Sequence, residues 1–227
     1  MPQVFADVVP GAVARVNVCK VGFMGNNVYV IENAADPADC FVVDPTSNAE
    51  FILLVLAGRI PKAIVCTHYH FDHVGAAAEL RAATAAPVYA SAIDAPRIQG
   101  EVEATGLRRV TPCPVDVQLE GGEELVLAGI PWKVMLTPGH SPGSLCLFSD
   151  APARTGLKPL LVAGDTLFDG NIGRTDFADG SMTDMLRSLT VLRELPADTC
   201  VLTGHESLTT IDALERSVFT YYLGPKN

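Results

Sequence analysis

Residues 66–75 read CTHYHFDHVG, and this stretch contains three of the five histidines of the chain within a span of six residues. A short β-rich run at 62–66 precedes the first histidine, and alanine-rich helical sequence runs from Asp72 to about residue 83. The pattern predicts a strand, a tight loop and a helix that begins inside the motif. Imidazole and carboxylate groups on a loop at a strand end are common metal ligands. We therefore expect a metal site here, which other parts of the chain complete.

Three further polar residues each follow an apolar run at the end of a predicted strand. His140 comes after WKVMLTPG, Asp165 after PLLVAG and His205 after CVLTG. A single histidine at such a place is usually structural, but here all five histidines of the chain follow strand ends. Convergence of those ends would place the five imidazoles in one cleft. For Asp165 the spacing alone also fits a turn in which the carboxylate bonds to its own backbone.

The spacing inside the first motif indicates two metal positions. In an extended loop His68 and His70 point the same way, because side chains alternate. Asp72 and His73 open the next helix and point elsewhere, which suits a second, adjacent metal. Nitrogen and carboxylate donors suit zinc and also iron or manganese, and no cysteine lies in these motifs.

Predicted strands and helices interleave along the chain. The strands are expected at 12–18, 27–32, 40–43, 62–66, 87–90, 124–127, 132–136, 144–148, 159–163 and 199–203, and the helices at 48–57, 72–83, 182–192 and 209–219. Residues 96–122 read as connections. Because strand pairs occur without a helix between them, the pattern favours two mixed sheets packed together with helices outside over a doubly wound sheet. No linker is evident, so we expect a single domain over residues 1–227.

Composition excludes several classes of partner. The net charge of −10 and the pI of about 4.8 argue against binding to nucleic acid or to anionic membranes. No stretch of about 18 apolar residues and no signal peptide is evident, so we expect no membrane span and a cytoplasmic location. The six cysteines form no C-x-x-C pair and are expected to be buried free thiols.

Four segments together resemble the metallo-β-lactamase superfamily. They are THYHFDH at 67–73, TPGHSPGS at 137–144, GDTLF at 164–168 and GH at 204–205, and the resemblance covers nearly the whole chain. It implies an α/β fold, the four-layer αββα sandwich of two mixed β-sheets flanked by helices. It also implies two zinc ions, with iron or manganese as alternatives. Carried over residue by residue, one metal is implied on His68, His70 and His140, the other on Asp72, His73 and His205, with Asp165 bridging them.

Within the superfamily, GDTLF-x(4)-GRTDF at 164–177 and the tail GHESLTTI resemble the glyoxalase II-like (YcbL-type) branch. That resemblance implies a dinuclear zinc thioesterase acting on a hydroxyacyl-glutathione, in which Asp72 both binds metal and orients the attacking hydroxide. One alternative is a mononuclear iron persulfide dioxygenase, with its iron implied on His68, His140 and Asp165. Another is a hydrolase of a different small ester, lactone or phosphoester. True β-lactamases typically bear cysteine where Asp165 stands, so antibiotic hydrolysis is not expected.

Other residues near the motifs have supporting roles in this interpretation. Asp44 ends a predicted strand and is either the partner of a ligand imidazole or an ordinary Asp-Pro turn. Arg174 and Asp176 are expected to form an ion pair that fixes the loop beside the GDT motif. Tyr69 and Phe71 alternate with the ligands, so packing is their expected role. The partner that this scheme requires is a small-molecule substrate, such as a glutathione conjugate.

Overall fold

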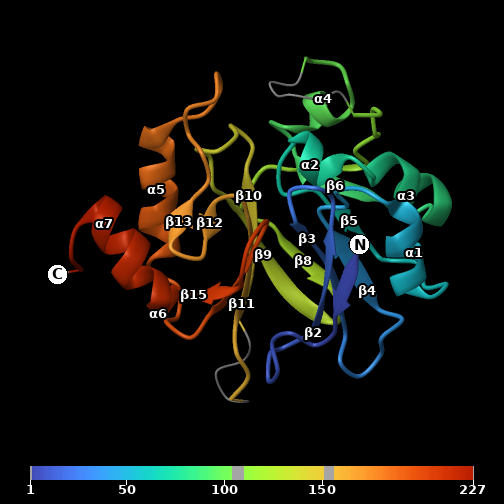
Figure 1. Ribbon diagram of the computed structural model, residues 1–227, viewed down its shortest axis with the longest axis horizontal. Coiled ribbons are helices and arrows are strands. Elements are labelled where there is room, and N and C mark those ends of the chain that lie inside the picture. Colours follow the sequence, from blue (N-terminus) through green and yellow to red (C-terminus); the bar gives the residue numbers. More distant parts are fainter. Residues whose placement is uncertain (1, 104–109, 151–155, 227) are drawn as a thin grey trace.

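The computed structural model describes residues 2–103, 110–150 and 156–226, and in it two β-sheets pack face to face with helices on both outer sides (Figure 1). The first sheet has strands β1 to β7 in chain order, and the second has the order β15-β14-β11-β10-β9-β8. Parallel and antiparallel pairs occur in both sheets. The predicted four-layer αββα sandwich of two mixed sheets is therefore confirmed.

The bounds of the strands are as follows. The first sheet contains β1 (Gln3–Phe5), β2 (Arg15–Val21), β3 (Asn26–Glu32), β4 (Cys40–Val43), β5 (Ile64–Val65), β6 (Val88–Ser91) and β7 (Val117–Leu119). The second contains β8 (Glu124–Leu127), β9 (Ile130–Leu136), β10 (Leu145–Ser149), β11 (Leu160–Gly164), β14 (Cys200–Thr203) and β15 (Thr209–Thr210). A separate antiparallel pair consists of β12 (Leu167–Phe168) and β13 (Asn171–Ile172).

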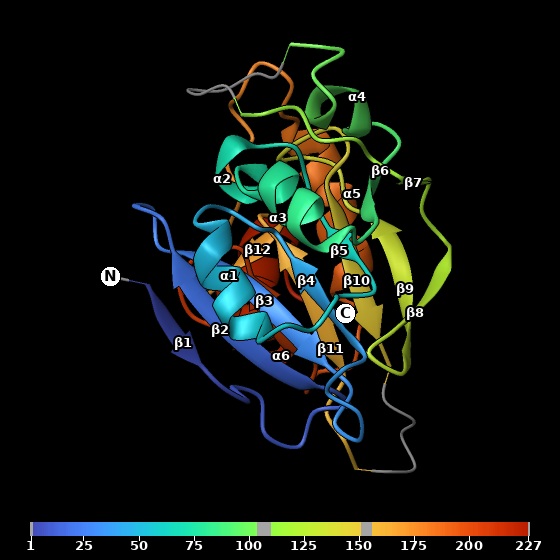
Figure 2. The same cartoon turned by 90° about the vertical axis from the view of Figure 1, so that its right-hand side faces the viewer.

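Helices cover the outer face of each sheet. Beside the first sheet lie α1 (Ala49–Leu56), α2 (Phe71–Val74), α3 (Ala77–Thr84) and α4 (Ala95–Ile98) (Figure 2). Beside the second lie α5 (Met182–Leu192), α6 (Ile211–Leu214), a π-helical turn at Glu215–Phe219 and α7 (Thr220–Leu223). Helix α5 has its predicted bounds because Ser181 caps it, its side chain accepting a hydrogen bond from the Asp184 amide. Within the described residues no helix is long and apolar enough to cross a membrane.

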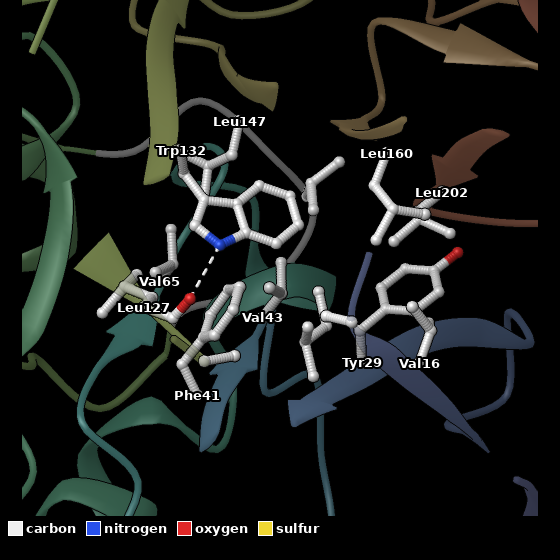
Figure 3. Packing of buried hydrophobic residues seen from close by; sticks show 14 of the residues in the cluster. Val16, Tyr29, Phe41, Val43, Val65, Leu127, Trp132, Leu147, Leu160 and Leu202 are labelled. Carbon is white, nitrogen blue, oxygen red and sulfur yellow. Dashed lines mark hydrogen bonds between the residues drawn. The ribbon is translucent and has the colours of Figure 1, made fainter. Parts of the chain in front are cut away.

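One apolar cluster fills the space between the sheets (Figure 3). Trp132 donates from its indole to a backbone carbonyl of β8 at 3.0 Å and meets Phe41 edge-on, with ring centroids 5.4 Å apart. Strand β4 contributes to two layers: Phe41 and Val43 face the other sheet, whereas Cys40 and Val42 pack beneath α1 and α3. Both faces of β4 are thus buried, which explains why its sequence is continuously apolar rather than alternating.

The helix predicted at 72–83 is wrong in one respect, because the structure divides it into α2 and α3. A Cβ on Gly75 would lie 2.9 Å from the Phe71 carbonyl oxygen and closer still to that of Thr46. The amide of Ala76 donates to the Pro45 carbonyl at 2.8 Å instead of continuing a regular helix. The loop after β4 therefore presses into the helix start, a contact that local sequence does not encode.

Two other predicted segments also differ. The connection predicted at 96–122 contains most of α4 and all of β7, and residues 104–109 of it lie outside the described part of the chain. The helix predicted at 209–219 begins as the short strand β15, which pairs antiparallel with β14 before α6 starts. Strands β1, β12 and β13 were not predicted, since each has only two or three residues.

Parallel pairing brings polar residues from distant segments to one edge of the sandwich. Strands β4, β5 and β6 run parallel to one another, and β11 runs parallel to β14. Asp44 directly follows β4 and Thr67 comes two residues after β5. In the other sheet Asp165 directly follows β11, and His205 comes two residues after β14. Loops at this edge carry the candidate site.

Candidate metal centre

All seven predicted ligands meet in one cluster at this edge. The three-histidine group consists of His68, His70 and His140, and the aspartate group consists of Asp72, His73 and His205. Within each group the donor atoms lie within 4.8 Å of one another. Asp165 lies between the groups: one carboxylate oxygen is 3.5 Å from Nε2 of both His140 and His205, and the other is 3.2 Å from Nε2 of His73.

The hydrogen bonds of His68 determine which of its ring nitrogens carries the proton. The Thr67 hydroxyl donates to an Asp44 carboxylate oxygen at 2.7 Å, so its oxygen is free to accept from Nδ1 of His68, 3.1 Å away. The lone pair of this neutral ring then lies on Nε2. That atom is buried and has no hydrogen-bond partner. A buried acceptor without a partner costs free energy unless a ligand occupies the space before it.

His140 and His70 turn ring nitrogens toward the same space. Nδ1 of His140 donates to the Arg174 carbonyl at 2.8 Å, which leaves Nε2 as the acceptor. That Nε2 lies only 2.8 Å from Nδ1 of His70. Burial, together with the neighbouring imidazoles, lowers the pKa of His68 well below its ordinary value and that of His70 to about 4. Burial also lowers the pKa of His140. The three-histidine group is thus a set of neutral nitrogen donors.

The aspartate group has the opposite electrostatics. Burial alone would lower the pKa of His73, but the carboxylates of Asp165 and Asp44 raise it well above its ordinary value. Burial likewise opposes the charge on His205, yet hydrogen bonds to Asp165 and Asp72 raise its pKa to about 9. Burial would raise the pKa of Asp72, which contact with His205 and His73 lowers to about 2. Protons and carboxylates neutralise each other here in the absence of a cation.

Partners outside the seven orient this group. Nδ1 of His73 donates to the Asp44 carboxylate at 2.9 Å, which turns Nε2 toward the cluster. Asp44 is therefore the partner of a candidate ligand imidazole, which was one of the two roles that the sequence left open for it. The Asn26 amide donates to the side chain of Asp72 at 3.0 Å and to its carbonyl at 2.9 Å. Sequence reasoning missed Asn26, since it begins a strand and belongs to no recognisable motif.

The cluster fits a metal ion by its chemistry and its shape. The orphaned Nε2 of His68, the converging imidazoles and the two carboxylates are the donor types that zinc, iron and manganese take. Gly204 keeps this space open, because a Cβ there would lie 2.7 Å from Cε1 of His73 and would also collide with Asp165. The positions of these residues therefore suit metal binding better than a packed polar core.

The supporting residues meet their expectations in part. Arg174 and Asp176 form the predicted ion pair at 2.8 Å, with both side chains largely exposed. Tyr69 is buried beneath the motif as expected, and its hydroxyl also donates to Asp179 at 2.8 Å. Phe71 is half-buried and also lines a cavity.

That cavity has a volume of about 300 Å³ and opens beside the aspartate group. Asp72 and Asn26 are among its lining residues, and Phe23 and Phe71 supply apolar surface. Hydroxyl groups of Thr46, Ser47 and Thr111 also line it. Apolar walls with a few polar groups beside candidate ligands are typical of a small-molecule site.

A family model described as the metallo-beta-lactamase superfamily matches residues 21–205, a span that includes all seven candidate ligands. The chain belongs to the metallo-β-lactamase superfamily. Within this superfamily, the probable metallo-hydrolase YqgX of Bacillus subtilis is 36% identical over 174 residues, covering 73% of this chain and 79% of YqgX. The hydroxyacylglutathione hydrolase of a Synechococcus strain is 34% identical over 191 residues, covering 83% of this chain and 67% of that enzyme.

Solved structures of the superfamily superpose closely on this chain. The BLEG-1 B3 metallo-β-lactamase has a TM-score of 0.77 at 30% identity and covers 96% of this chain and 99% of its own. TTHA1623, in a di-iron-bound form, has a TM-score of 0.73 at 34% identity and covers 87% and 96%. ETHE1 from Myxococcus xanthus has a TM-score of 0.70 at 25% identity and covers 89% and 82%. The likenesses to the Synechococcus hydroxyacylglutathione hydrolase and to ETHE1 support the predicted glyoxalase II-like branch of the superfamily.

Proposed function

We propose that the protein is a metal-dependent thioesterase that holds two metal ions, most simply zinc, with all seven residues of the cluster. The carrying observation is the pair of donor groups that share Asp165, with the buried Nε2 of His68 left without any hydrogen-bond partner. The proposed substrate is a hydroxyacyl-glutathione or a similar small thioester. Support for this class comes from the 34% identity to the Synechococcus hydroxyacylglutathione hydrolase.

The residues divide the work of such a reaction between them. Two zinc ions held there would polarise a thioester carbonyl and lower the pKa of a water molecule toward neutrality. Asp72 has a strongly lowered pKa, so its carboxylate stays ionised and can accept a hydrogen bond from the attacking water. The Asn26 amide, which donates to Asp72 at 3.0 Å, holds that carboxylate in one orientation. Because a thiolate leaves readily, no strong general acid is required.

The cavity beside Asp72 supports a small acyl group as the bound part of the substrate. Its volume of about 300 Å³ is at the lower end of the usual range for small-molecule pockets, and Phe23 and Phe71 offer apolar contact. Thr46 and Ser47 also line the cavity, so polar groups are available near a hydroxyacyl group. These features favour a short polar acyl chain over a long aliphatic one.

A second candidate is a mononuclear iron dioxygenase of persulfides, with iron on His68, His140 and Asp165. The 25% identity to ETHE1 is compatible with this alternative, and the di-iron form of TTHA1623 favours iron as a metal to test. Nε2 of His140 lies 3.5 Å from Asp165, so the two can serve one ion. Because both candidates use residues of the same cluster, the number and identity of the metals distinguish them.

The test is metal content followed by paired substrate assays on the purified protein. We expect elemental analysis to find close to two metal ions per chain, mainly zinc, and S-D-lactoylglutathione to release free thiol. A single iron per chain, with oxygen uptake on glutathione persulfide and no thiol release, would replace the thioesterase by the dioxygenase. A β-lactam substrate belongs in the same series, because of the likeness to BLEG-1. Faster hydrolysis of the β-lactam than of every thioester would contradict the proposal.

A further inference from the structure

Asp94 is a buried carboxylate that lies between the two loops of the three-histidine group. Its side chain has no exposed surface, and it follows β6 at the same sheet edge as Asp44 and Thr67. One oxygen accepts from the Tyr69 amide at 3.2 Å and from the Ser141 hydroxyl at 2.7 Å. The other accepts from the Gly143 amide at 3.0 Å.

These contacts join residues that are neighbours of all three histidines. Tyr69 stands between His68 and His70 in the chain, and Ser141 directly follows His140. The Asp94 carboxylate therefore holds the loop that carries His68 and His70 in a fixed position relative to the loop that carries His140. The hydrogen bonds span 25 and 47 residues of sequence, so they set the distance between two otherwise independent loops.

A merely local role does not account for this carboxylate. Asp94 occupies the N-cap position of the four-residue helix α4, yet its side chain makes no capping bond. Its own amide donates to Ser91 at 3.1 Å. Burial raises the pKa of Asp94 to about 6, against the hydrogen bond from Ser141 and the charge of Arg97, so ionising it here costs free energy. Gly143 must lack a side chain, because a Cβ would lie within 2.5 Å of the Asp94 carboxylate.

We propose that Asp94 is the positioning residue of the three-histidine group, and that it sets the metal affinity of that group without touching the metal. The inference rests on the metal-binding part of the proposed function. Asp44 has the corresponding role for the aspartate group through its hydrogen bond to His73. Asp44 also accepts from the Thr67 hydroxyl that faces His68, so it reaches both groups, whereas Asp94 contacts only the loops of the three-histidine group. Loss of an outer partner typically weakens metal binding by about 10- to 100-fold, and we expect the lower end because Asp94 acts through the backbone.

The experiment is a zinc titration, in competition with a chromophoric chelator, of the wild type and of Asp94→Asn, which keeps the side-chain shape. We expect one of the two zinc dissociation constants to rise about 10-fold and the other to stay unchanged. The matched control is Asp116→Asn. Asp116 also accepts a backbone amide, that of Val88 at 2.8 Å, but it lies at the opposite end of β6. Its variant should keep both wild-type constants.

Two further measurements separate positioning from general damage to the fold. Ser141→Ala removes one donor to Asp94 and should weaken the same zinc equivalent by a smaller factor, even if Asp94→Asn folds poorly. Stepwise Co²⁺ loading of Asp94→Asn should change the visible absorption of only one of the two bound ions. Reference spectra of His140→Ala and His205→Ala, each with one group disrupted, show which ion that is. In the His140→Ala variant the three-histidine group is already disrupted, so adding Asp94→Asn should not weaken zinc binding further.

Several outcomes would overturn the inference. Wild-type zinc affinities in both Asp94→Asn and Ser141→Ala would do so, as would equal weakening of both equivalents. An undiminished effect of Asp94→Asn in the His140→Ala background would show that the residue acts elsewhere. A wild type that binds no metal would overturn the proposed function as well, whereas two wild-type metals with unchanged variants would overturn only the role of Asp94.

Discussion

The three-histidine group and the aspartate group contain the same imidazole chemistry in opposite electrostatic surroundings. In the first, burial and neighbouring rings lower the pKa of His70 to about 4, so the rings are neutral donors. In the second, carboxylates raise the pKa of His205 to about 9, so the ring shares a proton with Asp72 and Asp165. Residue type alone therefore does not define a metal position. The difference comes from what each ring faces: burial and neighbouring rings dominate around His68 and His70, whereas carboxylates face His73 and His205.

The largest expected effect comes from removing one histidine from each group. His140→Ala and His205→Ala should each retain one metal ion of two, but at different positions. We expect thiol release from S-D-lactoylglutathione to fall by more than about 100-fold in both, because even loss of an outer partner costs 10- to 100-fold. Elemental analysis and the thioester assay check this. Two tightly bound ions in either variant would break the division into two groups.

Asp44→Asn should disturb the aspartate group most, through the direct hydrogen bond to His73, and His68 less, through Thr67. The backbone of Asp44 has a φ of 49°, a conformation that asparagine tolerates, so the substitution mainly removes the charge that His73 faces. We expect zinc at this group to bind about 10- to 100-fold more weakly, with a smaller loss at the other equivalent. Competition titration measures both constants. Greater weakening of the three-histidine equivalent would reverse the assignment of Asp44 and Asp94.

Gly143→Ala tests the close approach of the loop to Asp94. Its Cβ would overlap both Ser91 and the Asp94 carboxylate, so we expect a loss of about 1–3 kcal/mol in the free energy of unfolding. Metal binding at the three-histidine group should weaken with it. Gly11→Ala is the control: its φ of 74° strains an alanine by about 1 kcal/mol, but nothing lies within 4 Å of the new Cβ. Urea unfolding and zinc titration of both variants test this. Equal losses of unfolding free energy, with full metal affinity in both variants, would contradict the overlap.

The smallest expected effect is that of Tyr69→Phe. The phenol hydroxyl bonds to Asp179 at 2.8 Å, and its loss should lower the free energy of unfolding by about 1 kcal/mol. Metal affinity should not change, because Tyr69 reaches Asp94 through its backbone amide. Thermal unfolding and zinc titration together test this. A weakened three-histidine group would show that the ring, rather than the backbone, connects that group to Asp94.

Long-range contacts explain where sequence-based prediction of the fold succeeded and where it failed. Strand β4 and helix α5 have their predicted bounds, because an apolar run and a Ser181 cap are local signals. The division of the predicted helix at Gly75 follows from the loop after β4, which lies about 30 residues away in the chain. Asp94 follows a predicted strand by four residues, so the strand-end signal used for the histidines could have found it. It was missed because no motif marks it.

The order of residues along the chain predicted two mixed sheets with outer helices and five histidines that follow strand ends, and the resemblance of four motifs implied the superfamily and the two ligand groups. The folded chain added the hydrogen-bond partners and the burial that make the two groups electrostatically different. The proton positions on His73 and His140 depend on Asp44 and the Arg174 carbonyl, which are distant in sequence, and that on His68 depends on its neighbour Thr67, whose hydroxyl Asp44 orients. Asp44 and Asp94 likewise act over 29 and 47 residues of sequence. Hydrogen-bond direction and burial are properties of packed neighbours, and local spacing does not specify them.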